Sequence, residues 1–144
     1  MSPREQPAQR RSYELENECA ATIAHKGYRV HQRPAIQEVA EARERTGDTG
    51  RPSRRPDYLI EGHVFDCYSP QQKTSVRSIW TEVSHKVRSE QTQRVVINLT
   101  DWRGDIAMLK RQFDSWPVSG LKELAILDRT GRISQFTQRH RQEQ

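Results

Sequence analysis

The segment Arg55–Tyr68 constrains the fold most, because it predicts two short strands joined by a tight turn, with one aspartate on each strand. A two-residue hairpin loop at Glu61-Gly62 places Asp57 directly opposite Asp66 on the same face of the ladder. Directly opposed side chains have Cβ atoms about 4.5–5.5 Å apart, and two like charges so placed repel each other. A divalent cation between the carboxylates would turn this unfavourable pair into a site. The alternative is two solvated carboxylates on an outward face.

The apolar pattern predicts one domain at residues 12–137. Residues 1–11 are rich in Pro, Gln and Arg without periodicity and predict a disordered basic tail, and residues 138–144 predict a polar C-terminal tail. The order of helices and strands predicts an α/β (α+β) fold in which helices flank a mixed β-sheet. The expected elements are helices at 12–26, 35–45, 75–91 and 106–116, further strands at 28–31, 94–99, 123–127 and 132–136, and a flexible basic loop at 46–56.

Charge and composition narrow the class of partner. The formal net charge of +5 favours an acidic partner, above all nucleic acid. The sequence contains no run of about 18 apolar residues, which excludes a membrane span. Residues 1–7 lack the apolar core of a signal peptide. Cys19 and Cys67 share no metal-ligand spacing, so we expect two free thiols in a reducing compartment.

A third carboxylate is expected from the first helix. At about 100° per residue, Glu16 lies along the apolar stripe that contains Cys19, Ala20 and Ile23. Glu18 lies on the opposite side of the helix by the same count. A glutamate that faces the core is unfavourable unless something binds it, which indicates a functional role for Glu16. An interaction with the helix dipole is the alternative, and the choice between Glu16 and Glu18 stays open.

The long helix at 75–91 contributes a lysine. Lys86 lies at the edge of the apolar stripe of this helix, whereas Arg77 and Arg88 lie further from it. From this position the ammonium could reach over the sheet to the two aspartates and stabilise negative charge that develops on a phosphate. The alternative is a lysine that extends along apolar surface into solvent.

Together these residues resemble the PD-(D/E)xK nuclease superfamily, and within it the C-terminal tRNA-nuclease toxin domains of CdiA, the contact-dependent growth-inhibition effectors. The shared pattern is a helix-borne Glu16, then Pro56-Asp57, a second acid at Asp66 on the adjoining strand, and a downstream lysine. The likeness covers nearly the whole domain. In the superfamily motif the lysine follows the second acid by two residues. Here Tyr68 stands at that position, and Lys86 on the following helix takes the place of the lysine.

The resemblance implies a restriction-endonuclease-like core and metal-dependent hydrolysis of tRNA phosphodiester bonds. It implies that Asp57 and Asp66 bind the metal, usually Mg²⁺ with Zn²⁺ or Mn²⁺ as alternatives, and that Glu16 completes or orients the ligand shell. Lys86 would be the catalytic lysine. A cognate immunity protein would block the nuclease, which would act in the cytoplasm of a target cell. The basic residues expected to hold the RNA backbone are Arg29, Arg33, Arg51, Arg54 and Arg55.

Two other interpretations use the same residues. The first keeps the fold and takes DNA as the substrate, although the sequence offers no groove-reading helix with clustered base-contacting residues. The second is a non-catalytic, basic nucleic-acid-binding module. Among the tryptophans, Trp102 lies in an expected loop and could stack on bases, whereas Trp80 and Trp116 are expected to pack against the core.

Overall fold

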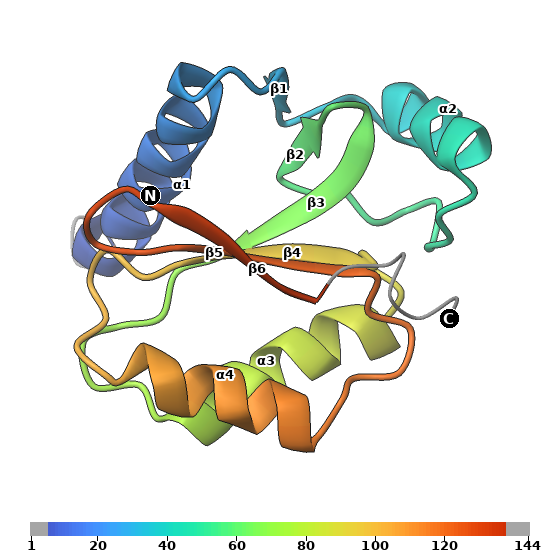
Figure 1. Ribbon diagram of the computed structural model, residues 1–144. Helices are drawn as coiled ribbons and strands as arrows, with labels where there is room; N and C mark the ends of the chain where they lie inside the picture. The colour runs from blue at the N-terminus through green and yellow to red at the C-terminus, as the bar shows by residue number, and fades with distance from the viewer. Residues whose placement is uncertain (1–5, 138–144) are drawn as a thin grey trace.

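The computed structural model describes residues 6–137, which form one six-stranded sheet with helices on both of its faces (Figure 1). Neighbouring strands follow the chain order from β1 to β6; β3, β4 and β5 are parallel, and the other neighbouring pairs are antiparallel. This arrangement confirms the predicted α/β fold with a mixed sheet. The elements are α1 (Gln6–His25), β1 (Val30–Gln32), α2 (Ile36–Thr46), β2 (Tyr58–Ile60), β3 (His63–Tyr68), α3 (Val76–Arg88), β4 (Arg94–Asn98), α4 (Ile106–Ser115), β5 (Glu123–Leu127) and β6 (Ile133–Thr137).

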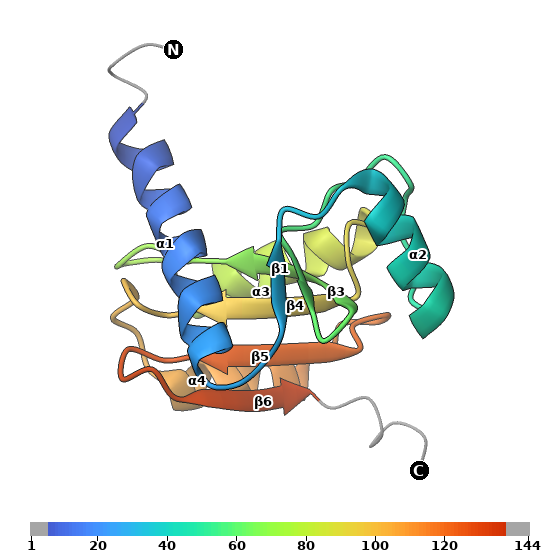
Figure 2. The ribbon, with the colours of Figure 1, turned by 90° about the horizontal axis from the view of Figure 1, so that it is seen from above.

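The core is divided between the two faces of the sheet. Helices α3 and α4 cover one face, and α1 crosses the other (Figures 1 and 2). Strand β4 is buried along its whole length because it lies between the two layers. Within the described residues, none of the helices combines the length and the apolarity needed to cross a membrane. The core residues of the α3–α4 layer include Ile79, Val83, Leu109, Phe113, Val95 and Ile97, and those of the α1 layer include Cys19, Ala20, Ile23, Tyr58, Phe65 and Val96.

The predicted hairpin is present in the predicted register. Ile60 pairs with His63 across the turn. Glu61 and Gly62 both have positive φ, 49° and 79°, which is the backbone of a type I′ turn. A glutamate is unusual at such a position, and here the Arg29 backbone N–H donates to its carboxylate at 2.7 Å. Glu-Gly is a weaker hairpin signal than Asn-Gly or Asp-Gly, and here a contact from the connection between α1 and β1 stabilises the turn.

Three predicted boundaries differ from the structure. The first helix begins at Gln6 rather than residue 12, so residues 6–11 of the predicted tail are helical, while residues 1–5 and 138–144 lie outside the described part. Arg11 explains the extension, because its guanidinium binds Asp101 at 2.7 Å and 3.0 Å. The first strand covers 30–32 instead of 28–31, and α3 ends at Arg88 instead of residue 91.

The predicted flexible basic loop, residues 46–56, is instead anchored to the core. Asp48 is 5% exposed and accepts two hydrogen bonds from Arg94, at 2.8 Å and 3.2 Å. Lys122 donates a third bond to the same carboxylate at 3.0 Å. A buried carboxylate requires such partners, because unpaired it would lose its hydration without compensation. These partners are 46 and 74 residues away in sequence. The local Gly- and Pro-containing pattern therefore predicted a flexible loop, because it carries no sign of the distant contacts.

Candidate active site

Asp57 and Asp66 lie side by side at the end of the β2–β3 hairpin that is away from its turn. The Asp57 backbone N–H donates to Asp66 Oδ1 at 3.1 Å, and the Cys67 N–H donates to Asp57 Oδ2 at 2.8 Å. Tyr58 pairs with Phe65 at the last ladder position, so one further step outward brings the two aspartates together. The hairpin prediction for this pair is confirmed. Reciprocal bonds to the backbone fix both carboxylates, which leaves little rotational freedom.

Lys86 reaches this pair from α3. Its Nζ donates to Asp66 Oδ2 at 2.9 Å, and the Gln91 side-chain amide donates to the same oxygen. The Asp66 side chain is fully buried, and that of Lys86 is 13% exposed. Removing either partner would leave a buried charge without compensation, so the ion pair is a fixed part of the site. The structure therefore brings together Asp57, Asp66 and Lys86 as the sequence predicted.

Asp57 resists ionisation in this site. Burial, followed by the charge of Asp66, raises the pKa of Asp57 from 3.8 to about 7, and the charge of Glu16 adds to the increase. Burial pulls the pKa of Lys86 down, but the charge and hydrogen bond of Asp66 outweigh it, so the pKa ends above its usual value. Lys86 is thus an ammonium at neutral pH. The charge of Lys86 lowers the pKa of Asp57 only partly, because burial and the neighbouring carboxylates raise it more.

Helix α1 presents Glu16 to the site and turns Glu18 into solvent. The Glu16 side chain is 15% exposed, and it accepts bonds of 3.3 Å from both Gln32 and Arg33. The Tyr58 hydroxyl donates to the Glu16 backbone carbonyl at 2.6 Å, which attaches this turn of α1 to β2. Glu18 is exposed. Of the two candidates, Glu16 is the carboxylate near Asp57, in agreement with the helix-face argument.

The five arginines predicted to bind nucleic acid are spread over different surfaces. Arg33 lies beside Glu16, close to the aspartates. Arg29 pairs with Glu61 at the hairpin turn, which is the opposite end of the hairpin from Asp57. In the basic loop, Arg51 is 3.7 Å from Glu90. The two remaining arginines, Arg54 and Arg55, are half-buried and exposed respectively.

Gln91 is a site residue that the sequence analysis missed. Helix α3 ends in a turn in which Glu90 has a φ of 61°, and the Gln91 N–H returns to the Lys86 carbonyl at 3.1 Å. Arg43 of α2 then binds the Gln91 carbonyl at 3.2 Å. This geometry directs the Gln91 amide at Asp66. A glutamine just after a helix carries no signal of its own, because its role depends on an unusual left-handed residue before it.

For the nuclease activity that the resemblance implies, Gln91→Ala is expected to lower RNA cleavage by about 10-fold or more, as removal of supporting hydrogen bonds around metal ligands does. Gln91→Glu should be worse, because it adds a carboxylate against Asp66. The measurement is the initial cleavage rate at several Mg²⁺ concentrations. Gln93→Ala serves as the control, since that side chain accepts a bond from Thr49 rather than contacting Asp66. Equal rates for Gln91→Ala and Gln93→Ala would contradict a role for Gln91.

Two of the three tryptophans differ from the prediction, whereas Trp80 packs against the core as expected. Trp102 is 2% exposed, and its indole N–H donates to the Thr74 carbonyl at 2.7 Å, so it is a core residue and not a platform for bases. Trp116, expected to pack, is 64% exposed. Its helix ends there and the ring points outward, while its carbonyl accepts a bond from the Trp80 indole. Burial of a loop tryptophan cannot be seen from local sequence, because the partners come from a distant segment.

The oxygen donors of the site fit a hard cation. Within residues 6–137, no three His, Cys, Asp or Glu side chains form a group that could hold a metal ion, so Glu16 does not join the two aspartates in one ligand set. Gln32 and Arg33 bind the Glu16 carboxylate instead. Mg²⁺ is commonly bound by one or two carboxylates, and it retains waters or takes substrate phosphates for the remaining positions. Asp57 and Asp66 match that type of site, and the raised pKa of Asp57 indicates that a cation would be favourable there.

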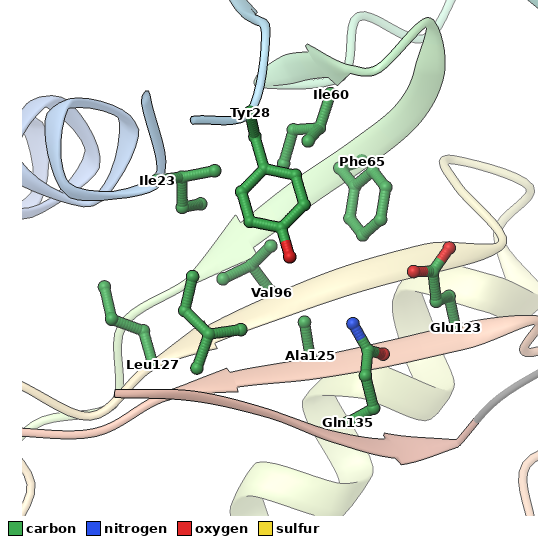
Figure 3. Close-up of a pocket in the computed structure, with 10 residues that line it drawn as sticks. Ile23, Tyr28, Ile60, Phe65, Val96, Glu123, Ala125, Leu127 and Gln135 are labelled. Atoms are coloured by element: carbon green, nitrogen blue, oxygen red, sulfur yellow. The ribbon is translucent and has the colours of Figure 1, made fainter. Parts of the chain in front are cut away.

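A separate apolar pocket of about 60 Å³ lies over β4, β5 and β6 (Figure 3). Tyr28 points into it from the segment after α1, and Glu123 and Gln135 are polar residues on its wall. None of the four predicted catalytic residues is among those that line it. The pocket is therefore distinct from the carboxylate site.

Comparison with known proteins gives consistent matches. The family model described as "Contact-dependent growth inhibition CdiA C-terminal domain" matches residues 54–133, a segment that contains Asp57, Asp66, Lys86 and Gln91. The protein named "tRNA nuclease CdiA-2" from Burkholderia pseudomallei (strain 1026b) is 36% identical over 124 residues, which cover 86% of this chain but 4% of that protein. A chain of the solved "CdiA-CT/CdiI toxin and immunity complex from Burkholderia pseudomallei" has a TM-score of 0.76 and 34% identity, over 94% of this chain and 91% of that chain.

Proposed function

This chain belongs to the contact-dependent growth inhibition CdiA C-terminal domain family, and we propose that it is a metal-dependent endonuclease that cleaves tRNA and is neutralised by a cognate immunity protein. The observation that carries the proposal is the buried assembly of Asp57, Asp66 and Lys86. The similarity to a protein named as a tRNA nuclease supports tRNA as the substrate. The similarity to a toxin in complex with its immunity protein supports the partner. The site of action would be the cytoplasm of a target cell.

In the proposed mechanism, Asp57 and Asp66 would hold a divalent cation, and their oxygen ligands favour Mg²⁺ or Mn²⁺ over Zn²⁺. Such a cation would supply Lewis-acid chemistry for the phosphate and for a water molecule. Asp57 is the carboxylate whose protonation changes near neutral pH, so its ionised form controls binding. Glu16 raises the negative charge of this region and thereby favours the cation.

Lys86 stabilises the negative charge that develops on the phosphate. Its ammonium carries three donors, of which one is bound to Asp66 Oδ2. Gln91 shares that oxygen, which fixes the carboxylate so that Lys86 keeps one orientation. An ammonium group held in one orientation in a largely buried site stabilises a transition state more strongly than a mobile ammonium group in water. Lys86 is therefore assigned the role of the catalytic lysine.

The RNA backbone is proposed to contact Arg33, and also Arg54 and Arg55, which directly precede Pro56-Asp57 in the chain. Arg33 is 58% exposed on its side chain and lies next to Glu16. Arg51 shares the loop with Arg54 and Arg55 but has Glu90 within 3.7 Å, which offsets part of its charge. Arg29 pairs with Glu61 at the hairpin turn and is assigned a weaker contribution. Phosphate contacts of this kind give salt-dependent affinity without sequence preference.

The experiment that tests the proposal is incubation of the purified chain with total tRNA and, separately, with plasmid DNA, each with Mg²⁺ and with EDTA. Denaturing gels are expected to show shortened tRNA in Mg²⁺ and intact plasmid. Cleavage of the plasmid with intact tRNA would support the DNA endonuclease instead. No cleavage of either substrate would support a non-catalytic binding module.

Mg²⁺ is also expected to stabilise the fold in the absence of RNA. A ligand that binds only the folded state stabilises it by an amount that grows with the logarithm of one plus the ratio of free ligand concentration to Kd, and so raises the unfolding temperature. We expect Mg²⁺ to raise the Tm of the wild type at pH 8, where Asp57 is ionised, and to leave the Tm of Asp57→Asn unchanged. Thermal scans with EDTA and with Mg²⁺ measure this effect. Equal shifts in the two proteins would contradict a cation site at Asp57.

A further inference from the structure

Tyr13 and Arg33 form a stacked pair on the surface beside the proposed catalytic site. The Arg33 guanidinium carbon is 5.0 Å from the centroid of the Tyr13 ring, which is the geometry of a cation–π contact. Tyr13 is one helical turn from Glu16 on α1, and it is 46% exposed. The fold buries only part of this residue, so the ring keeps an accessible surface on which a ligand can stack.

Arg33 is held in place by two further contacts and has an unusual backbone conformation. Its φ is 53°, a left-handed conformation that is uncommon for arginine, and the residue before a proline is ordinarily extended. Its backbone N–H donates to the Asp57 carbonyl at 2.8 Å, and its side-chain Nε donates to Glu16 at 3.3 Å. A strained residue persists where its surroundings determine its conformation, and such residues concentrate at functional sites. Arg33 thus connects the Tyr13 ring to the Glu16 carboxylate and to the backbone of Asp57.

On the basis of the proposed nuclease function, we propose that Tyr13 and Arg33 form a subsite that binds an unpaired nucleobase next to the scissile phosphate. Proteins recognise single-stranded RNA by stacking its bases on aromatic rings and on guanidinium planes. The pair offers both surfaces, and Arg33 adds positive charge for the adjoining phosphate. Its attachment to Asp57 and Glu16 places the bound nucleotide at a fixed distance from the catalytic carboxylates. We call Tyr13 and Arg33 the base subsite.

The test compares Tyr13→Ala, Tyr13→Phe and Tyr13→Leu with the wild type, using tRNA and measuring kcat/KM and the thermal unfolding midpoint. Loss of one base-stacking ring is expected to lower kcat/KM by roughly 5- to 100-fold. Tyr13→Phe should retain most of the activity because the phenyl ring still stacks, whereas Tyr13→Leu should behave like Tyr13→Ala. The matched control is Tyr28→Ala, which removes a tyrosine of the same 46% exposure from the separate apolar pocket.

A second measurement separates direct stacking from support of Arg33. Once the cleavage position in tRNA is mapped, synthetic tRNAs that lack one base at each unpaired position near it are cleaved by the wild type and by Tyr13→Ala. Stacking predicts one position at which loss of the base and loss of the ring are not additive. Additive losses at every position would overturn the base subsite, as would an unchanged kcat/KM for Tyr13→Ala while the wild type cleaves tRNA. Absence of cleavage by the wild type would overturn the proposed function and the base subsite with it.

Discussion

Replacing Asp57 with asparagine is expected to lower tRNA cleavage by at least about 10³-fold, because the site loses a charged ligand for the cation. The fold should persist, because asparagine is nearly isosteric and its carbonyl oxygen can still accept the 2.8 Å bond from Cys67 N–H. The bond from the Asp57 N–H to Asp66 is made by the backbone and is unaffected. The measurement is the cleavage rate of wild type and variant on denaturing gels. Asp114→Asn is the control, because that carboxylate is exposed on α4 in a surface pair with Lys110.

The same substitution should stabilise the protein without metal above neutral pH. The pKa of Asp57 is about 7 in the folded chain, against an ordinary value of 3.8, so between these values the folded state binds the proton more strongly. Stability is therefore lost as pH rises from about 4 to about 7, by up to roughly 4 kcal/mol for three pKa units. Asp57→Asn removes this loss. In EDTA, the free energy of unfolding of the variant should exceed that of the wild type at pH 8 and approach it at pH 5.

Urea unfolding at both pH values gives these free energies directly. Comparing the variant with the wild type cancels the contributions of other carboxylates, including Asp48, whose lowered pKa acts in the opposite direction at acid pH. An equal or lower stability of Asp57→Asn at pH 8 would show that the carboxylate pair carries no electrostatic strain. A more stable but inactive variant would indicate that the chain keeps an unfavourable charge for the sake of its chemistry.

The parts of the site that could be predicted from sequence are those set by local periodicity. The period of two along the hairpin placed Asp57 opposite Asp66, and the 3.6-residue period of α1 chose Glu16 over Glu18. The apolar stripe of α3 placed Lys86 at its edge, where its ammonium binds Asp66. In each case one face of an element is buried, so the pattern of apolar residues determines the direction of the polar ones.

The parts that could not be predicted depend on contacts between distant segments or on unusual backbone conformations. Gln91 reaches Asp66 because Glu90 adopts a left-handed conformation that a glutamate rarely takes. Asp48 can be buried because it binds Arg94, at the start of β4, and Lys122, just before β5. No periodic signal marks such residues, since their environment is created only when the sheet has formed.

Lys86→Met tests the buried ion pair and is expected both to abolish cleavage and to destabilise the fold. The Asp66 side chain is fully buried in the folded chain, and in the variant it would lose the ammonium group that lies 2.9 Å away. Breaking a buried pair by removing one partner costs about 3–5 kcal/mol, because the remaining charge is buried without compensation. The control is Lys110→Met, which breaks an exposed pair with Asp114 and should cost less than about 1 kcal/mol.

A second substitution separates the structural part of this effect from the catalytic part. Adding Asp66→Asn to Lys86→Met removes the uncompensated charge, so urea unfolding in EDTA should show that much of the lost stability returns. Cleavage should not return, because both the ammonium that stabilises the phosphate and one metal-binding carboxylate are absent. Recovery of cleavage together with stability would mean that Lys86 serves the fold alone. Recovery of stability without cleavage would locate the catalytic requirement in the charges of Lys86 and Asp66 themselves, independent of their contribution to the core.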